Sequence, residues 1–291
     1  MRPGGIWRTG VVLSTYEQPE YLRLALAGYG CQSCPPHEIL VADDGSGEAT
    51  ARVVAVAAEA IGIPIVHVLH PDRGFRKTLA LNRAILASTA EYLIFSDGDC
   101  IPNPHFVERH LALARRGRFV SGGYLKLPPE VTGEVTVEAV REGRVFDPAW
   151  LRARGWRPGR KALRVGRGPS TAALLDRLTP TRATWNGHNA STFRDHLIQV
   201  NGFDLDMEWG GEDRALGERL VHLGVRGIQA RFRTPVVHLH HGHPYVRDEA
   251  LARNRAIQDR IRRRREVRAR LGLAEIEEED GVRIRRFEVG G

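Results

Sequence analysis

The sequence predicts an α/β protein built on a mostly parallel, Rossmann-like central sheet with helices on both faces. Two observations support this fold class. Short apolar runs alternate with helical patterns between residues 11 and 96, which is typical of parallel strands joined by crossover helices. Polar residues directly follow three of the apolar runs, and in such sheets ligands bind beyond the carboxyl ends of the strands.

The first half of the chain supplies the alternating elements. The third of its helices is the most distinct, because its leucines and isoleucines recur at near-helical spacing. The second strand is closed by a turn signal, Asp43-Asp44-Gly45-Ser46. We expect strands at residues 11–15, 38–42, 63–69 and 92–96, and helices at residues 20–27, 49–61 and 77–90.

The second half is less regular. Residues 128–184 are rich in Arg, Gly and Pro and are predicted to form a long, partly mobile excursion. An ordered block follows, with a helix at 213–223 and a last strand at 235–239, and residues 249–271 read as a helix with nine arginines and three acids. The chain therefore divides into residues 1–127, 128–184, 185–245 and a basic helical tail at 246–291.

Composition narrows the class of protein. The 291 residues, 42% of them hydrophobic, suffice for a full core. No run approaches about 18 apolar residues and the N-terminus lacks an apolar signal region, so we expect a cytoplasmic location, free or at the inner membrane face. Cys31, Cys34 and Cys100 are read as reduced thiols. The net charge of +8 favours an anionic partner such as nucleic acid, acidic lipid or a nucleoside diphosphate.

Two acidic strand ends form the first candidate site. Asp97 and Asp99 follow the strand at 92–96, and such a pair can bind a divalent ion through oxygen ligands. A carboxylate of Asp43 or Asp44 can accept hydrogen bonds from a ribose or a base. Each pair alone could be a solvated turn, but two acidic ends in one sheet together favour a ligand site.

Basic residues lie at the start of the most distinct helix. Arg76 and Lys77 would face the same edge of the sheet. Their charges and the helix N-terminus favour a bound anion, and a solvated basic turn is the alternative.

A second acidic pair, Glu212 and Asp213, opens the helix predicted near 213–223. The pair could simply cap the helix, or it could provide a general base for an acceptor hydroxyl. The preceding Gly210 and Gly211 would let the backbone pass close to a ligand, and Trp209 could stack on a sugar face.

Four histidines lie at the end of the last predicted strand and just after it, in His238-Leu-His240-His241-Gly-His243. At least one is expected to bind metal, the alternative being a solvated strand end. An alternating strand would place His238 and His240 on one face. A histidine added to Asp97 and Asp99 would complete a ligand set that suits Mn2+.

These motifs resemble the inverting family 2 glycosyltransferases with a GT-A fold, and the C-terminal block is similar to a galactosyltransferase-type domain. The resemblance covers residues 9–127 and 184–245, and its parts come in the family's order: VVLSTYEQPEYL, ILVADDGS, NRAILASTAEYLIFSDGDCIP, WNGHNAS, GFDLDMEWGGEDRALGERLVHLG and VVHLHHGHP. Two departures leave the choice of substrate open. Arg214 stands where many relatives carry an acid, and residues 128–184 have no counterpart, although they could face the acceptor.

The resemblance implies roles in donor binding. Thr15, Asp43 and Asp44 would line the nucleoside pocket, and Arg76 and Lys77 would lie near the base and the phosphates.

It also implies a metal site. Asp99 would bind the metal directly, and Asp97 would contact the ribose or the metal. His238 matches the family's distal metal ligand best, because it directly follows the last strand, and His240 and His241 are its rivals.

The acceptor half of the site would centre on Asp213 as catalytic base, with Glu212 holding the acceptor or the donor sugar. Residues in or beside these motifs are expected to contact the acceptor: Trp209, Gly211, Asn186 and Asn189.

The resulting hypothesis is a hexosyltransferase-type enzyme of polysaccharide or glycoconjugate synthesis that uses Mn2+ or Mg2+. It would move a sugar from a nucleoside diphosphate, UDP by resemblance, to a carbohydrate, lipid-linked or other hydroxyl acceptor, with inversion. One alternative is a nucleotidyltransferase, which would normally carry a Gly-rich basic loop where this chain has residues 14–19. Another is a nucleic-acid-binding module, which would not need Glu212 and Asp213. The Arg-rich tail could contact anionic membrane lipid, remain solvated or form an oligomer contact.

Overall fold

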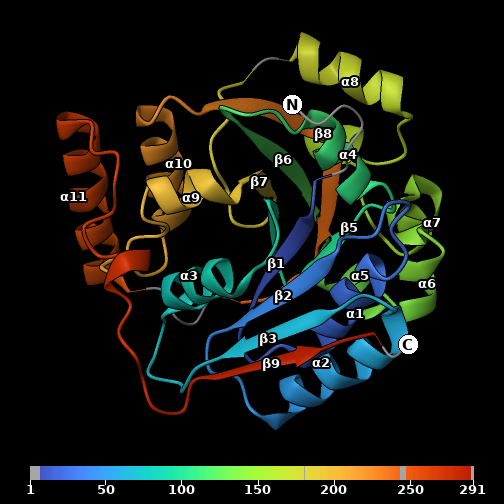
Figure 1. Ribbon diagram of the computed structural model, residues 1–291. Coiled ribbons are helices and arrows are strands. Elements are labelled where there is room, and N and C mark those ends of the chain that lie inside the picture. Colours follow the sequence, from blue (N-terminus) through green and yellow to red (C-terminus); the bar gives the residue numbers. More distant parts are fainter. Residues whose placement is uncertain (1–6, 180, 243–246, 290–291) are drawn as a thin grey trace.

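One continuous sheet organises the molecule, as the computed structural model in Figure 1 shows. The structure describes residues 7–179, 181–242 and 247–289. Within these residues the sheet has nine strands in the order β5-β8-β6-β7-β4-β1-β2-β3-β9. Helices cover both of its faces, so the predicted α/β class is confirmed.

The four parallel strands predicted from the first half form the middle of this sheet: β1 (Thr9–Thr15), β2 (Glu38–Asp43), β3 (Ile65–Leu69) and β4 (Tyr92–Asp97). Side chains alternate between the faces. Val11 and Leu13 pack with α1 (Pro19–Tyr29) and α2 (Glu48–Ile61), whereas Val12 packs with α3 (Lys77–Ala87). All seven elements are confirmed, with shifts of a few residues at their ends.

The second half extends the sheet with strands in mixed directions. Strand β7 (Ala190–Phe193) runs antiparallel to both β4 and β6 (Arg118–Lys126), β5 (Cys100–Pro102) runs antiparallel to β8 (Arg226–His238), and β6 is parallel to β8. The prediction of a mostly parallel sheet is therefore right for its middle and wrong for the whole. Helices α4 (Phe106–Leu113), α9 (Arg194–Gln199) and α10 (Glu212–His222) complete the two outer layers.

Residues 128–184 are more regular than the sequence indicates. They contain α5 (Pro129–Gly133), α6 (Val137–Arg141), α7 (Pro148–Ala153), α8 (Pro169–Leu178) and two 3-10 turns (Arg144–Phe146 and Arg160–Arg164). Trp150 and Trp156 are buried in a third hydrophobic cluster that also contains Leu239 from the end of β8. Because most of these helices are only a turn or two long, they leave little periodicity in the sequence.

The C-terminal tail packs against the rest of the fold. Helix α11 (Asp248–Arg264) buries Ile257 and Ile261 against Met207, which precedes α10, and against Ala215 in α10. The helix ends earlier than predicted, at Arg264, because Arg265 adopts a left-handed conformation with φ 50°. After a 3-10 turn (Leu273–Glu275), β9 (Arg283–Phe287) pairs antiparallel with β3, an element that the sequence did not reveal.

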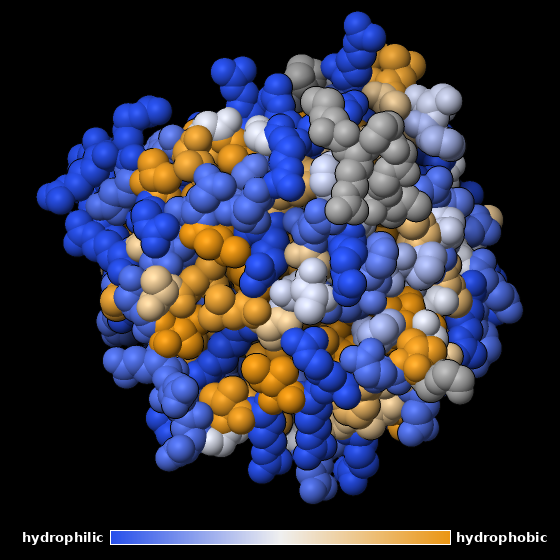
Figure 2. Space-filling model, in the orientation of Figure 1, coloured by the Kyte–Doolittle hydropathy of each residue, from blue (hydrophilic) through white to orange (hydrophobic). Residues whose placement is uncertain are grey.

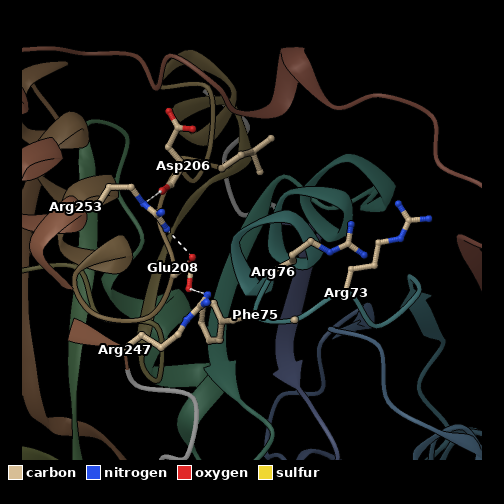
Figure 3. Close-up of a pocket in the computed structure, with 9 residues that line it drawn as sticks. Arg73, Phe75, Arg76, Asp206, Glu208, Arg247 and Arg253 are labelled. Atoms are coloured by element: carbon tan, nitrogen blue, oxygen red, sulfur yellow. Dashed lines mark hydrogen bonds and ion pairs between the residues drawn. The ribbon is translucent and has the colours of Figure 1, made fainter. Parts of the chain in front are cut away.

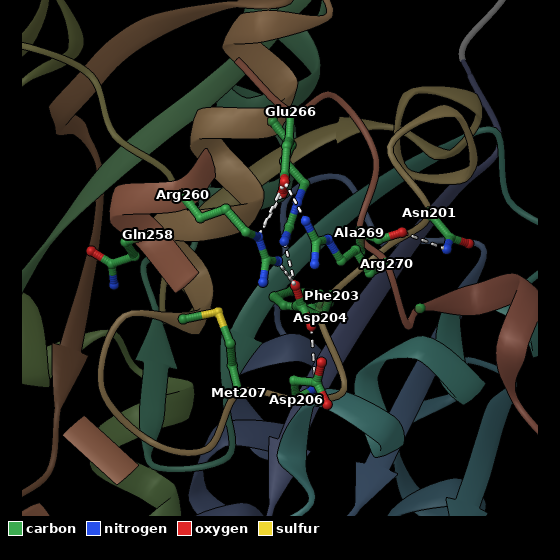
Figure 4. A network of polar contacts seen from close by, with 12 residues as sticks. Asn201, Phe203, Asp204, Asp206, Met207, Gln258, Arg260, Glu266, Ala269 and Arg270 are labelled. Carbon is green, nitrogen blue, oxygen red and sulfur yellow. Dashed lines mark hydrogen bonds and ion pairs between the residues drawn. The ribbon is translucent and has the colours of Figure 1, made fainter. Parts of the chain in front are cut away.

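A buried polar network joins the tail to α10 (Figure 4). Asp204 and Arg219 form an ion pair in which both side chains are fully buried. Arg260 of α11 lies 3.9 Å from Asp204 and binds Glu266 at 3.1 Å. A buried charge needs such partners, so several arginines of the tail serve the fold.

The surface and the thiols agree with the composition. Figure 2 shows mostly hydrophilic residues on the side of the molecule where α11 lies. Among the described residues, the helices lack the combination of length and apolarity that membrane crossing requires. Cys31, Cys34 and Cys100 are free thiols, as expected.

Candidate active site

A cavity of about 570 Å³ lies at the carboxyl ends of β1, β2 and β4, beside the start of α10. This is the edge of the sheet at which the sequence places its polar strand ends. Both halves of the chain line the cavity: Ser14, Thr15, Tyr16, Glu17, Gln18, Ala42, Asp44, Gly74, Phe75, Lys77, Asp97, Gly98, Asp99, His188, Trp209, Glu212, Asp213, His238, His241 and Gly242.

Asp97 ends β4 and is held by two neighbours. Lys77 Nζ lies 2.8 Å from its Oδ1, and the Ser14 hydroxyl donates to the same oxygen at 2.5 Å. Burial would raise the pKa of Asp97, but Lys77 and Ser14 lower it below its usual range. Asp97 is therefore an ionised carboxylate, and its partners are a cation and a hydroxyl.

Asp99 faces two histidines. His241 Nε2 lies 2.6 Å from Asp99 Oδ2, and His238 Nε2 lies 3.8 Å from the same atom. Their imidazole rings stack with centroids 5.3 Å apart. Cys100 lies close enough to be a further ligand, and its thiol donates to Asp99 Oδ1 at 3.2 Å.

These donors fit a divalent metal. His238 Nδ1 donates to the Leu239 carbonyl at 2.6 Å, and His241 Nδ1 donates to the Gly242 carbonyl at 2.7 Å. Each ring therefore presents Nε2 to Asp99, and such a backbone contact fixes the tautomer of a metal-binding histidine. One carboxylate and two imidazoles form a mixed oxygen and nitrogen set that suits Mn2+.

The expected pairing of His238 with His240 is wrong in its geometry. Strand β8 ends at His238, so the alternation stops there. The backbone N–H of His240 binds Thr132 Oγ1 at 3.0 Å, and it is His241 that reaches Asp99. His243 lies outside the described residues.

Asp213 lies in the first turn of α10, partly open to the cavity. Burial and the neighbouring Glu212 raise the pKa of Asp213 to about 7, against the opposing effect of Lys77. Its Oδ1 is buried and has no hydrogen-bond partner among the described residues. A carboxylate with a pKa near neutrality and an oxygen left over is suited to accept a proton.

The loop of residues 208–211, which leads into the acidic pair Glu212 and Asp213, is supported by α11. Glu212 is buried and its Oε2 accepts a hydrogen bond from the Gly210 backbone N–H at 2.8 Å. Gly211 has φ 113°, and a Cβ there would lie 1.8 Å from Nε2 of Gln258. The expectation that Gly211 contacts the acceptor is therefore corrected, because it packs against α11 instead. Trp209 does line the cavity.

The nucleoside side is only partly as predicted. Thr15 and Asp44 line the cavity. Asp43 is fully buried and binds His67 Nε2 and the Ser46 backbone N–H, each at 2.8 Å, so it shapes the turn without reaching the cavity.

The side chain of Arg76 is also placed differently from the prediction. It binds Glu279 at 3.0 Å, whereas its backbone N–H holds Asp44 at 2.9 Å. Arg76 therefore supports the nucleoside side of the cavity through its backbone, and Lys77 alone of this pair lines it.

The two asparagines predicted for the acceptor lie behind the cavity. Asn189 is fully buried and binds the Gly123 carbonyl at 2.8 Å, the Thr234 carbonyl and His110, so it links β6, β8 and α4. Asn186 donates to Ser121 Oγ at 3.2 Å. The amide of Asn189 is used by the fold, which corrects its prediction. Asn186 Oδ1 is buried without a hydrogen-bond partner among the described residues, so its contact with the acceptor stays a prediction.

Gly187 and His188 lie between these asparagines and were not among the residues predicted for the site. His188 lines the cavity, and burial lowers its pKa to about 4, so the ring is neutral near pH 7. A Cβ at Gly187 would lie 2.6 Å from a carboxylate oxygen of Asp213, and the Gly187 backbone N–H donates to that carboxylate. The WNGHNAS motif contained the signal, but which of its residues face the cavity depends on β7.

Family models match most of the chain. Residues 10–160, more than half of the 291, match the model described as glycosyl transferase family 2. Residues 180–242 match the model described as the N-terminal domain of galactosyltransferase.

Two curated relatives are similar at low identity. Chondroitin synthase of Escherichia coli and hyaluronan synthase of Pasteurella multocida are each 24% identical to this chain over alignments that cover 77% of it. The chain spans 34% of the first relative's length and 24% of the second's.

Solved structures share the fold. A mannosyltransferase, PcManGT from Pyrobaculum calidifontis, in complex with GDP-Man and Mn2+, aligns with a TM-score of 0.54 and 20% identity, over 84% of this chain and 60% of that one. TarS of S. aureus aligns with a TM-score of 0.53 and 14% identity, over 80% of this chain and 37% of that one. These likenesses confirm the predicted GT-A fold.

The support that α11 gives to the loop of residues 208–211 can be tested at its glycines. Gly211→Ala should lower the free energy of unfolding by about 2–4 kcal/mol, since it adds backbone strain and displaces Gln258. Gly224→Ala is the matched control, with φ 98° and nothing within 4 Å of its Cβ, and should cost only about 1–2 kcal/mol. Urea unfolding of both variants measures the difference, and equal losses would contradict the packing described.

Proposed function

The chain belongs to glycosyl transferase family 2, and on this premise we propose that it is an inverting, metal-dependent transferase that moves a sugar from UDP to an acceptor hydroxyl. Family membership sets aside the nucleotidyltransferase and the nucleic-acid-binding module. The observation that carries the mechanism is Asp213, a carboxylate with a pKa raised to about 7 that shares one cavity with Asp97, Asp99 and three histidines.

The donor would lie on the β-strand side of the cavity. Thr15 and Asp44 are available to the nucleoside, and Lys77 is a cation close to where a diphosphate would extend toward Asp99. Asp99, His238 and His241 would hold Mn2+ or Mg2+. When bound, such an ion supplies charge that stabilises the departing diphosphate.

The acceptor would enter beside Trp209 and α10. Asp213 takes the proton from the acceptor hydroxyl as its oxygen attacks the anomeric carbon of the donor sugar. The bond from that carbon to the diphosphate oxygen breaks on the opposite face, so the configuration inverts. Glu212 holds the loop through Gly210 and keeps the pKa of Asp213 high. The product would be a lengthened polysaccharide or another glycoconjugate.

The nucleotide can be identified by thermal shift. UDP with Mn2+ should raise the melting temperature, and UDP with a chelator should raise it much less, because the diphosphate would then lack its counter-charge. GDP and ADP with Mn2+ are the controls. A larger shift with GDP would replace the UDP assignment, and shifts that do not respond to metal would contradict the metal model.

The base is tested by Asp213→Asn. Turnover should fall by about 100-fold to 10,000-fold, whereas the thermal shift with UDP and Mn2+ should persist. In the wild type, kcat/KM should rise with pH up to about 7 and then level, because the base works only when deprotonated. Asp259→Asn, on the exposed side of α11, is the control.

The same variant has a signature in stability. An unfolded Asp loses its proton near pH 4, roughly, whereas folded Asp213 holds it up to about pH 7. The contribution of this group to the free energy of unfolding is therefore full below about pH 4 and is lost as the pH rises from there through about 7. Asp213→Asn should accordingly be no less stable than the wild type at pH 8.

Two activity results would overturn the base assignment. One is wild-type turnover in the Asp213→Asn variant, and the other is a kcat/KM of the wild type that stays flat between about pH 5.5 and 8.

The metal site is tested with two neighbouring histidines. His238→Ala should raise the Mn2+ concentration needed for half-maximal transfer by at least about tenfold. His240→Ala should leave it unchanged, because His240 contacts Thr132 and Tyr21 through its backbone, which the substitution keeps. Equal effects of the two substitutions in a Mn2+ titration would contradict the assignment.

A further inference from the structure

A second cavity, of about 670 Å³, adjoins the first and is lined by four arginines: Arg73, Arg76, Arg247 and Arg253 (Figure 3). Gly74 and Phe75 line both cavities, so the two adjoin at this loop. Its volume is in the range of small-ligand sites.

Four arginines line the cavity against two acids, Asp206 and Glu208. Arg247 and Arg253 share the carboxylate of Glu208, which lies between them in Figure 3. Arg73 and Arg76 share Glu279, which lies outside the cavity, with Arg83. One carboxylate has two oxygens and a guanidinium has five N–H donors. Each arginine pair therefore keeps donors for a further anion.

Three of the four arginine side chains are accessible. The exposed fractions are 62% for Arg73, 62% for Arg247 and 50% for Arg253. The guanidiniums come from two separate elements, the loop before α3 and the start of α11, which lie on opposite sides of Figure 3. Those of Arg247 and Arg253 gather at Glu208, whereas those of Arg73 and Arg76 point away from it. Planar guanidinium groups arranged in this way suit carboxylate or phosphate oxygens.

The loop before α10 places this cavity on the acceptor side. Glu208 faces the arginine cavity, and the next residue, Trp209, faces the cavity that contains Asp213. A chain whose terminal hydroxyl lay at Asp213 and that extended along Trp209 or Phe75 would lead toward the arginine cavity.

We propose that the arginine cavity binds an anionic group of the acceptor, a carboxylate or a phosphate, one or more units away from the hydroxyl that receives the sugar. The substrate class is accordingly an acidic acceptor chain. This inference rests on the proposed transferase function, and neither Arg247 nor Arg253 lines the cavity that contains Asp97 and Asp99.

The test compares two double variants with equal loss of charge. Arg247→Gln with Arg253→Gln removes one wall of the cavity. Arg262→Gln with Arg263→Gln is the control, because both residues are exposed on the same helix and neither lines the cavity. Arg73→Gln alone probes the opposite wall. Thermal shift with UDP and Mn2+, measured on every variant, reports folding and the donor site independently of the acceptor.

Three probes separate the source of the anion: a hexasaccharide containing glucuronic acid, its carboxyl-reduced derivative and a glycerol phosphate hexamer. Wild-type protein should bind at least one acidic probe about tenfold or more tightly than the reduced derivative, as measured by calorimetry at low salt. The cavity double variant should lose about tenfold to a hundredfold of that affinity, Arg73→Gln should also weaken it, and the control should keep it.

The outcomes are distinct. Tighter binding of the uronate or of the phosphodiester probe identifies the anion. Equal binding of acidic and reduced probes, or equal losses in the cavity and control variants, would overturn the proposal while the nucleotide shift leaves the transferase assignment intact. A missing nucleotide shift in the wild type would instead count against the proposed function.

Discussion

Lys77 allows carboxylates from both halves of the chain to share one cavity. It lies 2.8 Å from Asp97, and Asp97, Asp213 and Glu212 together raise its pKa well above the usual value despite its burial. Burial raises the pKa of Asp213 to about 7 and the charge of Glu212 adds to this effect, while Lys77 opposes it. One cation thus keeps Asp97 ionised while it leaves Asp213 able to exchange a proton. Both properties depend on one spatial contact, because Lys77, the first residue of α3, lies beside Asp97, the last residue of β4.

The features that the sequence predicted are those that local pattern and chain direction determine. Four apolar runs became β1 to β4, and parallel strands bring their carboxyl ends to one edge. Asp44, Asp97 and Asp99 therefore had to meet there, whatever the details of packing. Glu212 and Asp213 joined them because the second half of the chain adds its strands to the same sheet.

The features that it missed depend on partners far away in the chain. Asn189 resembles a binding residue in sequence, but its amide is enclosed by β6, β8 and α4. The side chain of Arg76 turns away because Glu279, some 200 residues later, binds it. The choice between His240 and His241 follows from the residue at which β8 ends. Periodicity also fails where helices are short, as in residues 128–184, and where β6 contains the pair Gly122 and Gly123.

Helix α11 connects catalysis with the site inferred for the acceptor. Gln258 and Asn254 hold the backbone of the loop that leads into Asp213, by bonds to the carbonyls of Gly211 and Trp209 at 3.1 Å each. Arg253, one residue before Asn254, faces the arginine cavity from the same helix. The loop that separates the two cavities is thus held by the helix that lines one of them. A segment that looks like a basic appendage in the sequence is therefore a structural support of the active site, and its arginines contribute both to the buried network around Asp204 and to the charge of the second cavity.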